Sequence, residues 1–189
     1  MTDPILVAPI RLLLVDVDGT LIGGDLKISP RVRRAIDEAR QRGVQVSLCT
    51  GRPEPSIRRF VDEMQLTGFH IVDSGATIVD SLEGVVLYHR TMLRATCHEI
   101  VDYARKAGIY LEVYVPDGYF IEREDAHSQI HTRTQGWAAT FQNLDQVIER
   151  YAVTKMESVA LDEAEAEQVQ TMLDHFSGQI DMAGQSCRA

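Results

Sequence analysis

Two carboxylates stand two positions apart where an apolar run of the chain ends. The run covers residues 10–17, and the two acids are Asp16 and Asp18, followed by Gly19. Acidic groups at a strand end are costly to bury without compensation, and Mg²⁺ is a natural partner because it prefers oxygen ligands. A carboxylate can also attack phosphorus while a second group protonates the leaving alcohol. The pair therefore indicates phosphoryl-transfer chemistry, with a solvated Asp-Gly turn as the plain alternative.

A hydroxyl-bearing residue follows a second apolar run. Thr50 and Gly51 come directly after residues 44–49. A hydroxyl and free backbone amides at such a place can bind a phosphoryl oxygen. A Thr-Gly pair after a strand is by itself usually only a turn. Its position one strand–helix unit after Asp16 is what makes it a candidate phosphate-binding pair. If both runs are neighbouring strands, the two groups emerge at one edge of the same sheet.

The first part of the chain alternates strands with helices. Its apolar runs are continuous, which is typical of strands buried on both faces of a parallel sheet, and they lie at residues 10–17, 44–49 and 69–72. Helices are expected at residues 30–42 and 54–64, the first with Ser29 as its N-cap. This order predicts a parallel sheet with right-handed crossovers.

The second part has a different rhythm. After Ser74, two short strands are expected at residues 75–79 and 84–90, and a helix at residues 93–107. A hairpin is expected from the strands at residues 109–115 and 119–122. A strand, a helix and a last short strand follow, at residues 154–161, 163–176 and 179–182. The polar stretch 123–142 is not assigned to any element. These elements predict a separate α+β domain, with a boundary near residues 80–84.

Three segments of the first part resemble the motifs of a known family. Residues 14–21, Leu-Val-Asp-Val-Asp-Gly-Thr-Leu, resemble the first motif of haloacid dehalogenase-like hydrolases. Residues 48–52, Leu-Cys-Thr-Gly-Arg, resemble the second motif in the Cof-like branch, which acts on sugar phosphates and related small phosphate esters. Residues 73–76, Asp-Ser-Gly-Ala, resemble that branch's Asn-Gly-Ala loop, although Ser74 stands where the branch usually has Asn.

The resemblance assigns roles to these residues. It implies that Asp16 is the nucleophile and a magnesium ligand, that Asp18 is the general acid/base with its backbone carbonyl on the metal, and that Thr50 binds the transferring phosphoryl group. The residues expected to bind substrate are Val17, Gly19, Thr20, Gly51, Arg52, Ser74 and Gly75. The implied fold is α/β: a partial Rossmann-like parallel-sheet core at residues 1–81, with a large α+β cap at residues 82–189 inserted after the second motif.

Other motifs of the family are expected after the cap. The third motif supplies a Lys and the fourth an acidic cluster, and this chain ends at Ala189, inside or just past the cap. Lys155 is not assigned the family's Lys because it lies in a predicted cap strand. His127 and His131 have helical spacing for a metal pair, but a solvated polar face explains them better. The sequence thus predicts the nucleophile half of an active site and an uncovered half-core through which the chain self-associates.

Composition narrows the classes of partner and location. A net charge of −9 disfavours a nucleic-acid partner, and the chain has no apolar stretch long enough to span a membrane. Three cysteines without metal-like spacing, and an N-terminus without a signal-peptide pattern, are typical of a cytoplasmic protein with reduced thiols. The expected partner is a small phosphorylated metabolite.

Four functional readings follow from these observations. The first is a magnesium-dependent phosphatase that hydrolyses phosphate monoesters through an aspartyl-phosphate. The second is a truncated, catalytically incompetent fragment or a phosphate-ester-binding protein. A phosphomutase of the same superfamily is disfavoured because the segment between Asp18 and Thr50 is too short for its cap. A phospho-accepting signalling domain is disfavoured by the long predicted cap.

Overall fold

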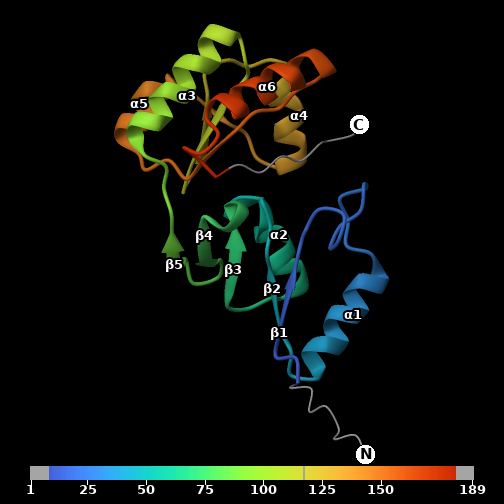
Figure 1. Ribbon diagram of the computed structural model, residues 1–189. Helices are drawn as coiled ribbons and strands as arrows, with labels where there is room; N and C mark the ends of the chain where they lie inside the picture. Colours follow the sequence, from blue (N-terminus) through green and yellow to red (C-terminus); the bar gives the residue numbers. More distant parts are fainter. Residues whose placement is uncertain (1–8, 117, 182–189) are drawn as a thin grey trace, which may run out of the picture.

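The computed structural model describes residues 9–116 and 118–181, which form two lobes joined by the segment between β5 and α3 (Figure 1). In chain order, the first lobe contains β1 (Leu12–Val15), α1 (Pro30–Gln41), β2 (Gln45–Leu48), α2 (Glu54–Met64), β3 (Phe69–Val72), the 3-10 turn η1 (Asp73–Gly75), β4 (Thr77–Asp80) and β5 (Val85–His89). The second lobe contains α3 (Arg94–Ala107), β6 (Glu112–Val115), β7 (Gly118–Ile121), α4 (Ala126–Gln135), β8 (Thr140–Phe141), α5 (Leu144–Arg150), β9 (Lys155–Glu157) and α6 (Glu163–His175).

Local sequence signals explain the two helices of the first lobe. The Ser29 side chain accepts a hydrogen bond from the Val32 backbone N–H, and Pro30 is the first helical residue of α1. This confirms the predicted N-cap. Helix α2 covers the predicted residues and buries one face, whose apolar residues are Ile57, Phe60, Val61 and Met64. Both helices therefore pack where the hydrophobic pattern places them.

The sheet of the first lobe carries the predicted parallel strands. Strand β1 pairs in parallel with β2, and an isolated parallel bridge between Cys49 and Ile71 brings β3 beside β2. Strands β4 and β5 extend the sheet in antiparallel fashion from β3. The prediction of a parallel sheet is confirmed for β1, β2 and β3.

Strand β1 lies at the edge of the described sheet. Leu12 and Leu14 are 51 % and 47 % exposed, so the expectation that this strand is buried on both faces is wrong. A continuous apolar run predicts a strand whose two faces are both covered by other elements. Among the described residues, β1 has a paired strand on one side only, and the described elements leave its leucine side chains partly exposed.

Strand alternation gives the second-lobe sheet two different faces. Its strands lie in the order β8-β7-β6-β9. Val113 and Val115 of β6 belong to the apolar core under α3, α5 and α6, whereas Tyr114 belongs to an aromatic cluster with Tyr119 of β7. Lys155 pairs with Tyr114 in the sheet and contacts the first lobe, so this aromatic face is turned toward the first lobe. Helices α3, α5 and α6 lie on the side away from it (Figure 1).

Several second-lobe elements were not predicted. Helix α4 and strand β8 lie within the unassigned stretch 123–142, and α5 had no expectation attached to it. The expected last strand at residues 179–182 is a single bridge between Ser177 and Ile180, with Met182 outside the described residues. Because β5 pairs with β4, residues beyond 81 still belong to the first-lobe sheet. The division into domains at residues 1–81 and 82–189 remains a prediction. No helix in the described ranges is long and apolar enough to cross a membrane.

Candidate active site

The loop after β1 turns tightly and exposes its two carboxylates. The Leu21 backbone N–H donates to the Asp16 carbonyl at 3.1 Å, and the Gly19 N–H donates to the Ile22 carbonyl at 3.0 Å. Gly19 adopts a positive φ of 76°, which glycine tolerates without steric cost. The side chains of Asp16 and Asp18 are both exposed, whereas that of Val17 between them is completely buried. Val17 could therefore reach a ligand only through its backbone.

A buried arginine holds the second carboxylate. The Arg52 Nε and Nη2 atoms donate to the two carboxylate oxygens of Asp18, each at 2.8 Å. Arg52 is 6 % exposed, while the Asp18 side chain is 42 % exposed. A two-pronged pairing of this kind fixes the direction of a carboxylate as well as its distance. Residues of the first two predicted motifs are thus in direct contact.

The loop after β2 packs against the loop after β3. Thr50 is buried, and its hydroxyl oxygen accepts from the Arg52 backbone N–H at 3.2 Å. The Ser74 N–H donates to the Thr50 carbonyl at 3.1 Å, and the Asp73 N–H donates to the Arg52 carbonyl at 3.0 Å. A Cβ atom at Gly51 would lie 3.2 Å from the Ser74 hydroxyl oxygen, closer than is usual. The loops that carry the predicted phosphate-binding residues are therefore locked together.

This locking is accompanied by backbone strain in η1. Asp73, Ser74 and Gly75 have φ values of 52°, 55° and 92° in succession. For residues other than glycine, the left-handed region costs on the order of 1–3 kcal/mol and persists only where surrounding contacts impose it. The hydrogen bonds to Thr50 and Arg52 are such contacts. Strain of this kind clusters at functional sites.

The Asp73 carboxyl group is a feature of the site that sequence reasoning missed. Its side chain is 10 % exposed and lies 3.9 Å from the Lys155 Nζ atom. Burial raises the pKa of Asp73 to about 6, while the nearby Lys155 charge and a hydrogen bond from Thr77 act in the opposite direction. Asp73 is the first residue of the Asp-Ser-Gly-Ala segment, and this position was a signal for a role in the site. The resemblance assigned roles only to Ser74 and Gly75 of that segment.

Lys155 reaches this loop cluster from the second lobe. The sequence placed it in a cap strand, and β9 confirms that strand. Its ammonium group donates to the Gly51 carbonyl at 2.7 Å and pairs with Glu157. The two lobes are therefore joined at the loop that carries Thr50 and Gly51.

Oxygen donors for a hard cation are present where the sequence places them. Asp16 offers an exposed carboxylate, and Asp18 offers its backbone carbonyl, because both of its carboxylate oxygens face Arg52. An oxygen-only donor set with one carboxylate fits Mg²⁺, which usually keeps several waters and takes ligands from substrate phosphate. The residues present thus fit a magnesium ion.

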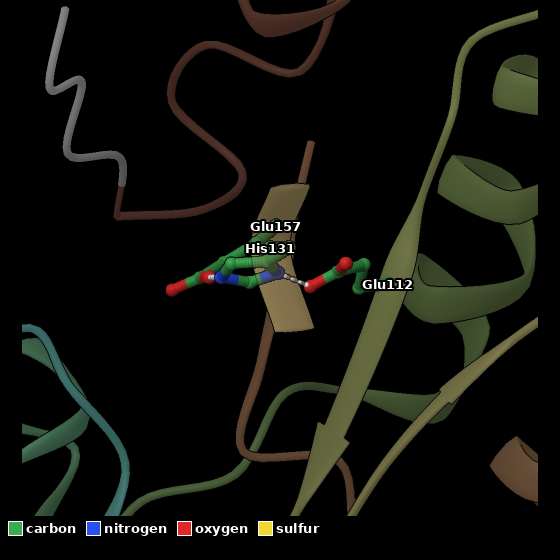
Figure 2. Close-up of side chains that lie close together, drawn as sticks. All are labelled: Glu112, His131 and Glu157. Carbon is green, nitrogen blue, oxygen red and sulfur yellow. Dashed lines mark ion pairs between the residues drawn. The ribbon is translucent and has the colours of Figure 1, made fainter. Parts of the chain in front are cut away.

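A second acidic group of residues lies in the cap and meets this loop through Lys155. Glu112, His131 and Glu157 lie close together on β6, α4 and β9 (Figure 2). His131 does not pair with His127, which lies instead between Asp125 and Glu165. The two histidines therefore do not form the ligand pair that their spacing allowed.

Comparison with known proteins identifies the family. The family model described as haloacid dehalogenase-like hydrolase matches residues 13–186. The chain belongs to this family. A solved haloacid dehalogenase-like hydrolase from Bacteroides thetaiotaomicron has a TM-score of 0.78 at 20 % identity, covering 90 % of this chain and 64 % of its own. The α/β fold class with a cap domain is thereby confirmed for this haloacid dehalogenase-like hydrolase.

Curated relatives of this haloacid dehalogenase-like hydrolase are named as phosphatases. The 5-amino-6-(5-phospho-D-ribitylamino)uracil phosphatase YwtE of Bacillus subtilis is 31 % identical over 122 residues, which cover 64 % of this chain and 41 % of YwtE. The HMP-PP phosphatase of Yersinia pestis is 26 % identical over 127 residues, which cover 67 % of this chain and 46 % of that protein. The Cof-like resemblance is confirmed, and the chain spans less than half the length of these relatives.

Proposed function

We propose that this chain carries the nucleophile and cap of a magnesium-dependent phosphatase that hydrolyses small phosphate monoesters through an aspartyl-phosphate. The observation that carries the proposal is the contact between the two motif loops. Asp16 is exposed at the end of β1, and Asp18, two residues later, is held by Arg52 from the loop that also contains Thr50. The phosphatase relatives support this class of reaction. The corresponding substrate is a small phosphorylated metabolite, and the proposed location is the cytoplasm.

The chain's own carboxylates account for both chemical steps. A carboxylate oxygen of Asp16 attacks phosphorus, the ester P–O bond breaks, and the leaving alcohol oxygen takes a proton from the Asp18 carboxyl group. In the second step Asp18 accepts a proton from water, whose oxygen attacks the phosphorus of the aspartyl-phosphate. Inorganic phosphate leaves and the Asp16 carboxylate is restored. A bound Mg²⁺ would neutralise phosphate charge during both steps.

The surrounding residues bind and orient the phosphoryl group. The Thr50 oxygen accepts from the Arg52 N–H, which leaves the hydroxyl proton available for a phosphoryl oxygen. The backbones of Val17, Gly19 and Thr20 lie in the turn after Asp16; the Gly19 and Thr20 N–H groups donate to the Ile22 and Val17 carbonyls, so they would have to exchange these partners to bind a phosphate. Gly51, Ser74 and Gly75 line the neighbouring loops, and Arg52 fixes Asp18. These assignments are part of the proposal.

A single substitution tests the nucleophile. In a version of the protein that carries all four motifs of the family, Asp16→Asn keeps the size of the side chain but removes the attacking charge, so hydrolysis of p-nitrophenyl phosphate with Mg²⁺ should become undetectable. Asp62→Asn makes the same change on the exposed side of α2 and should leave the rate unchanged. When the unsubstituted protein is trapped during turnover, mass spectrometry should find one added phosphoryl group on Asp16. Turnover within about tenfold of the unsubstituted chain in Asp16→Asn would refute the assignment.

A further inference from the structure

Lys155 belongs to the face of the cap sheet that is turned toward the core. It lies opposite Tyr114 in the pairing of β9 with β6, and so shares the face of Tyr114 rather than that of Val113. Its Nζ atom lies 4.6 Å from the centre of the Tyr114 ring. The next residue, Met156, packs on the opposite face with the apolar core. The register of β9 therefore directs the Lys155 ammonium group to the seam between the lobes.

The ammonium group is enclosed by groups from both lobes. The Lys155 side chain is 13 % exposed. It donates to the Gly51 carbonyl at 2.7 Å, pairs with Glu157 of its own strand and lies 3.9 Å from the Asp73 carboxylate. Burying a lysine is costly unless its charge is paired. Two carboxylates and one carbonyl therefore hold this cation beside the loop that contains Thr50.

A buried network in the cap fixes the position of Glu157. His131 lies between the two carboxylates, with Nδ1 facing Glu112 and Nε2 lying 3.5 Å from Glu157 (Figure 2). The hydroxyl groups of Tyr110 and Tyr114 donate to Glu112 at 2.6 and 2.9 Å. Glu157, which pairs with Lys155, is thus in contact with this network through His131. The network therefore helps to anchor Lys155.

The present partner of Lys155 on the core side is replaceable. A backbone carbonyl is a neutral acceptor, whereas a phosphate oxygen carries negative charge, so Coulomb attraction to the ammonium group adds to the hydrogen bond. A phosphate oxygen bound beside Thr50 would therefore compete well with the Gly51 carbonyl for the ammonium group. The Arg52 guanidinium, a second cation at this loop cluster, faces Asp18. The loop cluster itself is acidic because it carries Asp16, Asp18 and Asp73, so an incoming phosphate dianion requires positive charge there.

We propose that Lys155 is a substrate-binding residue, which the cap brings to the core so that its ammonium group binds an oxygen of the phosphate monoester. This inference rests on the proposed function, since it assumes that a phosphate group binds beside Thr50. Lys155 is a cap residue, and it therefore makes phosphate binding depend on the position of the cap. When phosphate is absent, the Gly51 carbonyl takes its place and keeps the lobes together.

Equilibrium binding of inorganic phosphate to the 189-residue chain tests the proposal without requiring turnover. Lys155→Met removes the charge and all donors, while Lys155→Gln keeps a neutral donor for the Gly51 carbonyl. In calorimetric titrations with phosphate, both variants should raise the dissociation constant by about tenfold or more. Lys155→Arg retains the charge and should stay within about threefold. Lys106→Met, on the exposed side of α3, makes the same change in net charge and should have no effect.

The outcomes separate this proposal from a purely structural role and from the proposed function. If Lys155 only joins the lobes, phosphate affinity will be unchanged in Lys155→Gln, and the proposal is overturned. It is also overturned if the unsubstituted chain binds no phosphate at millimolar concentration. If Lys155→Met does not fold, as judged by near-ultraviolet circular dichroism, the Gln and Arg variants decide. Binding that depends on Lys155, together with no turnover in a version of the protein that carries all four motifs of the family, would contradict the phosphatase proposal alone.

Discussion

Asp73→Asn is expected to stabilise the protein at alkaline pH. Burial raises the pKa of Asp73 from 3.8 to about 6 in the folded state. Between these two values the unfolded chain has already lost the proton that the folded protein still holds, so stability falls as pH rises through this window. Asn carries no charge at any pH and is enriched in the left-handed region, so the strained backbone of η1 can be retained.

The magnitude follows from the size of the pKa shift. A rise from 3.8 to about 6 corresponds to about 3 kcal/mol of lost stability once the carboxylate is ionised in both states. At pH 8 the Asn variant should therefore be more stable than the unsubstituted protein by up to about 3 kcal/mol. Well below pH 3.8 the two proteins should have nearly equal stability, because Asp73 is then protonated in both the folded and the unfolded state.

Urea unfolding at a series of pH values measures this difference. Asp62→Asn serves as the control, because Asp62 is exposed on α2 and its substitution should change the free energy of unfolding by less than about 0.5 kcal/mol. The reasoning is refuted if Asp73→Asn is equally stable, or less stable, than the unsubstituted protein at pH 8. It is also refuted if the difference does not shrink as the pH falls from 7 to 4.

Two further predictions concern the motif loops. In a version of the protein that carries all four motifs of the family, Arg52→Lys keeps the charge but cannot pair with both Asp18 oxygens, so kcat for p-nitrophenyl phosphate should fall by roughly tenfold or more with little change in KM. A kcat within about twofold would show that the pairing does not orient the acid. Magnesium should bind weakly to this chain, with a millimolar dissociation constant in calorimetric titration, because the donors assigned among the described residues are one carboxylate and one carbonyl. Micromolar affinity together with clear turnover would show that further ligands complete the site.

The sequence predicts the candidate site from local signals. Asp16 and Thr50 each follow an apolar run, and parallel strands bring their carboxyl ends to one edge, so the contact between the two loops could be expected. The pairing of Arg52 with Asp18 could not, since a side-chain direction is set by packing. Lys155 was placed in the correct strand, but its partner Gly51 lies 104 positions earlier in the chain. No pattern within one strand reports such a contact.

Missed elements have equally specific causes. Helix α5 is short, yet its buried residues Leu144, Val147 and Ile148 have helical spacing and Asn143 caps it, so the pattern was available. Helix α4 lacks such a pattern because its inward-facing side chains include His127 and His131, which the network of carboxylates makes compatible with burial. Exposure of β1 depends on which elements lie beside it, and the composition of the strand does not contain that information.

The left-handed turn of η1 also limits which sequences this family can use there. Ser74 has a φ of 55°, a conformation that Asn adopts much more readily than most residues and that β-branched residues avoid. The Cof-like branch usually has Asn at this position, and the backbone alone gives a reason for that preference, independent of any contact with substrate. Sequence variation at residues 73–75 should accordingly be filtered first by conformation, with Gly, Asn and Asp tolerated and Val, Ile and Thr excluded. If this turn is the same among relatives, the reason is therefore the backbone geometry that joins the loops. Such constancy would say little about which phosphate ester each relative prefers.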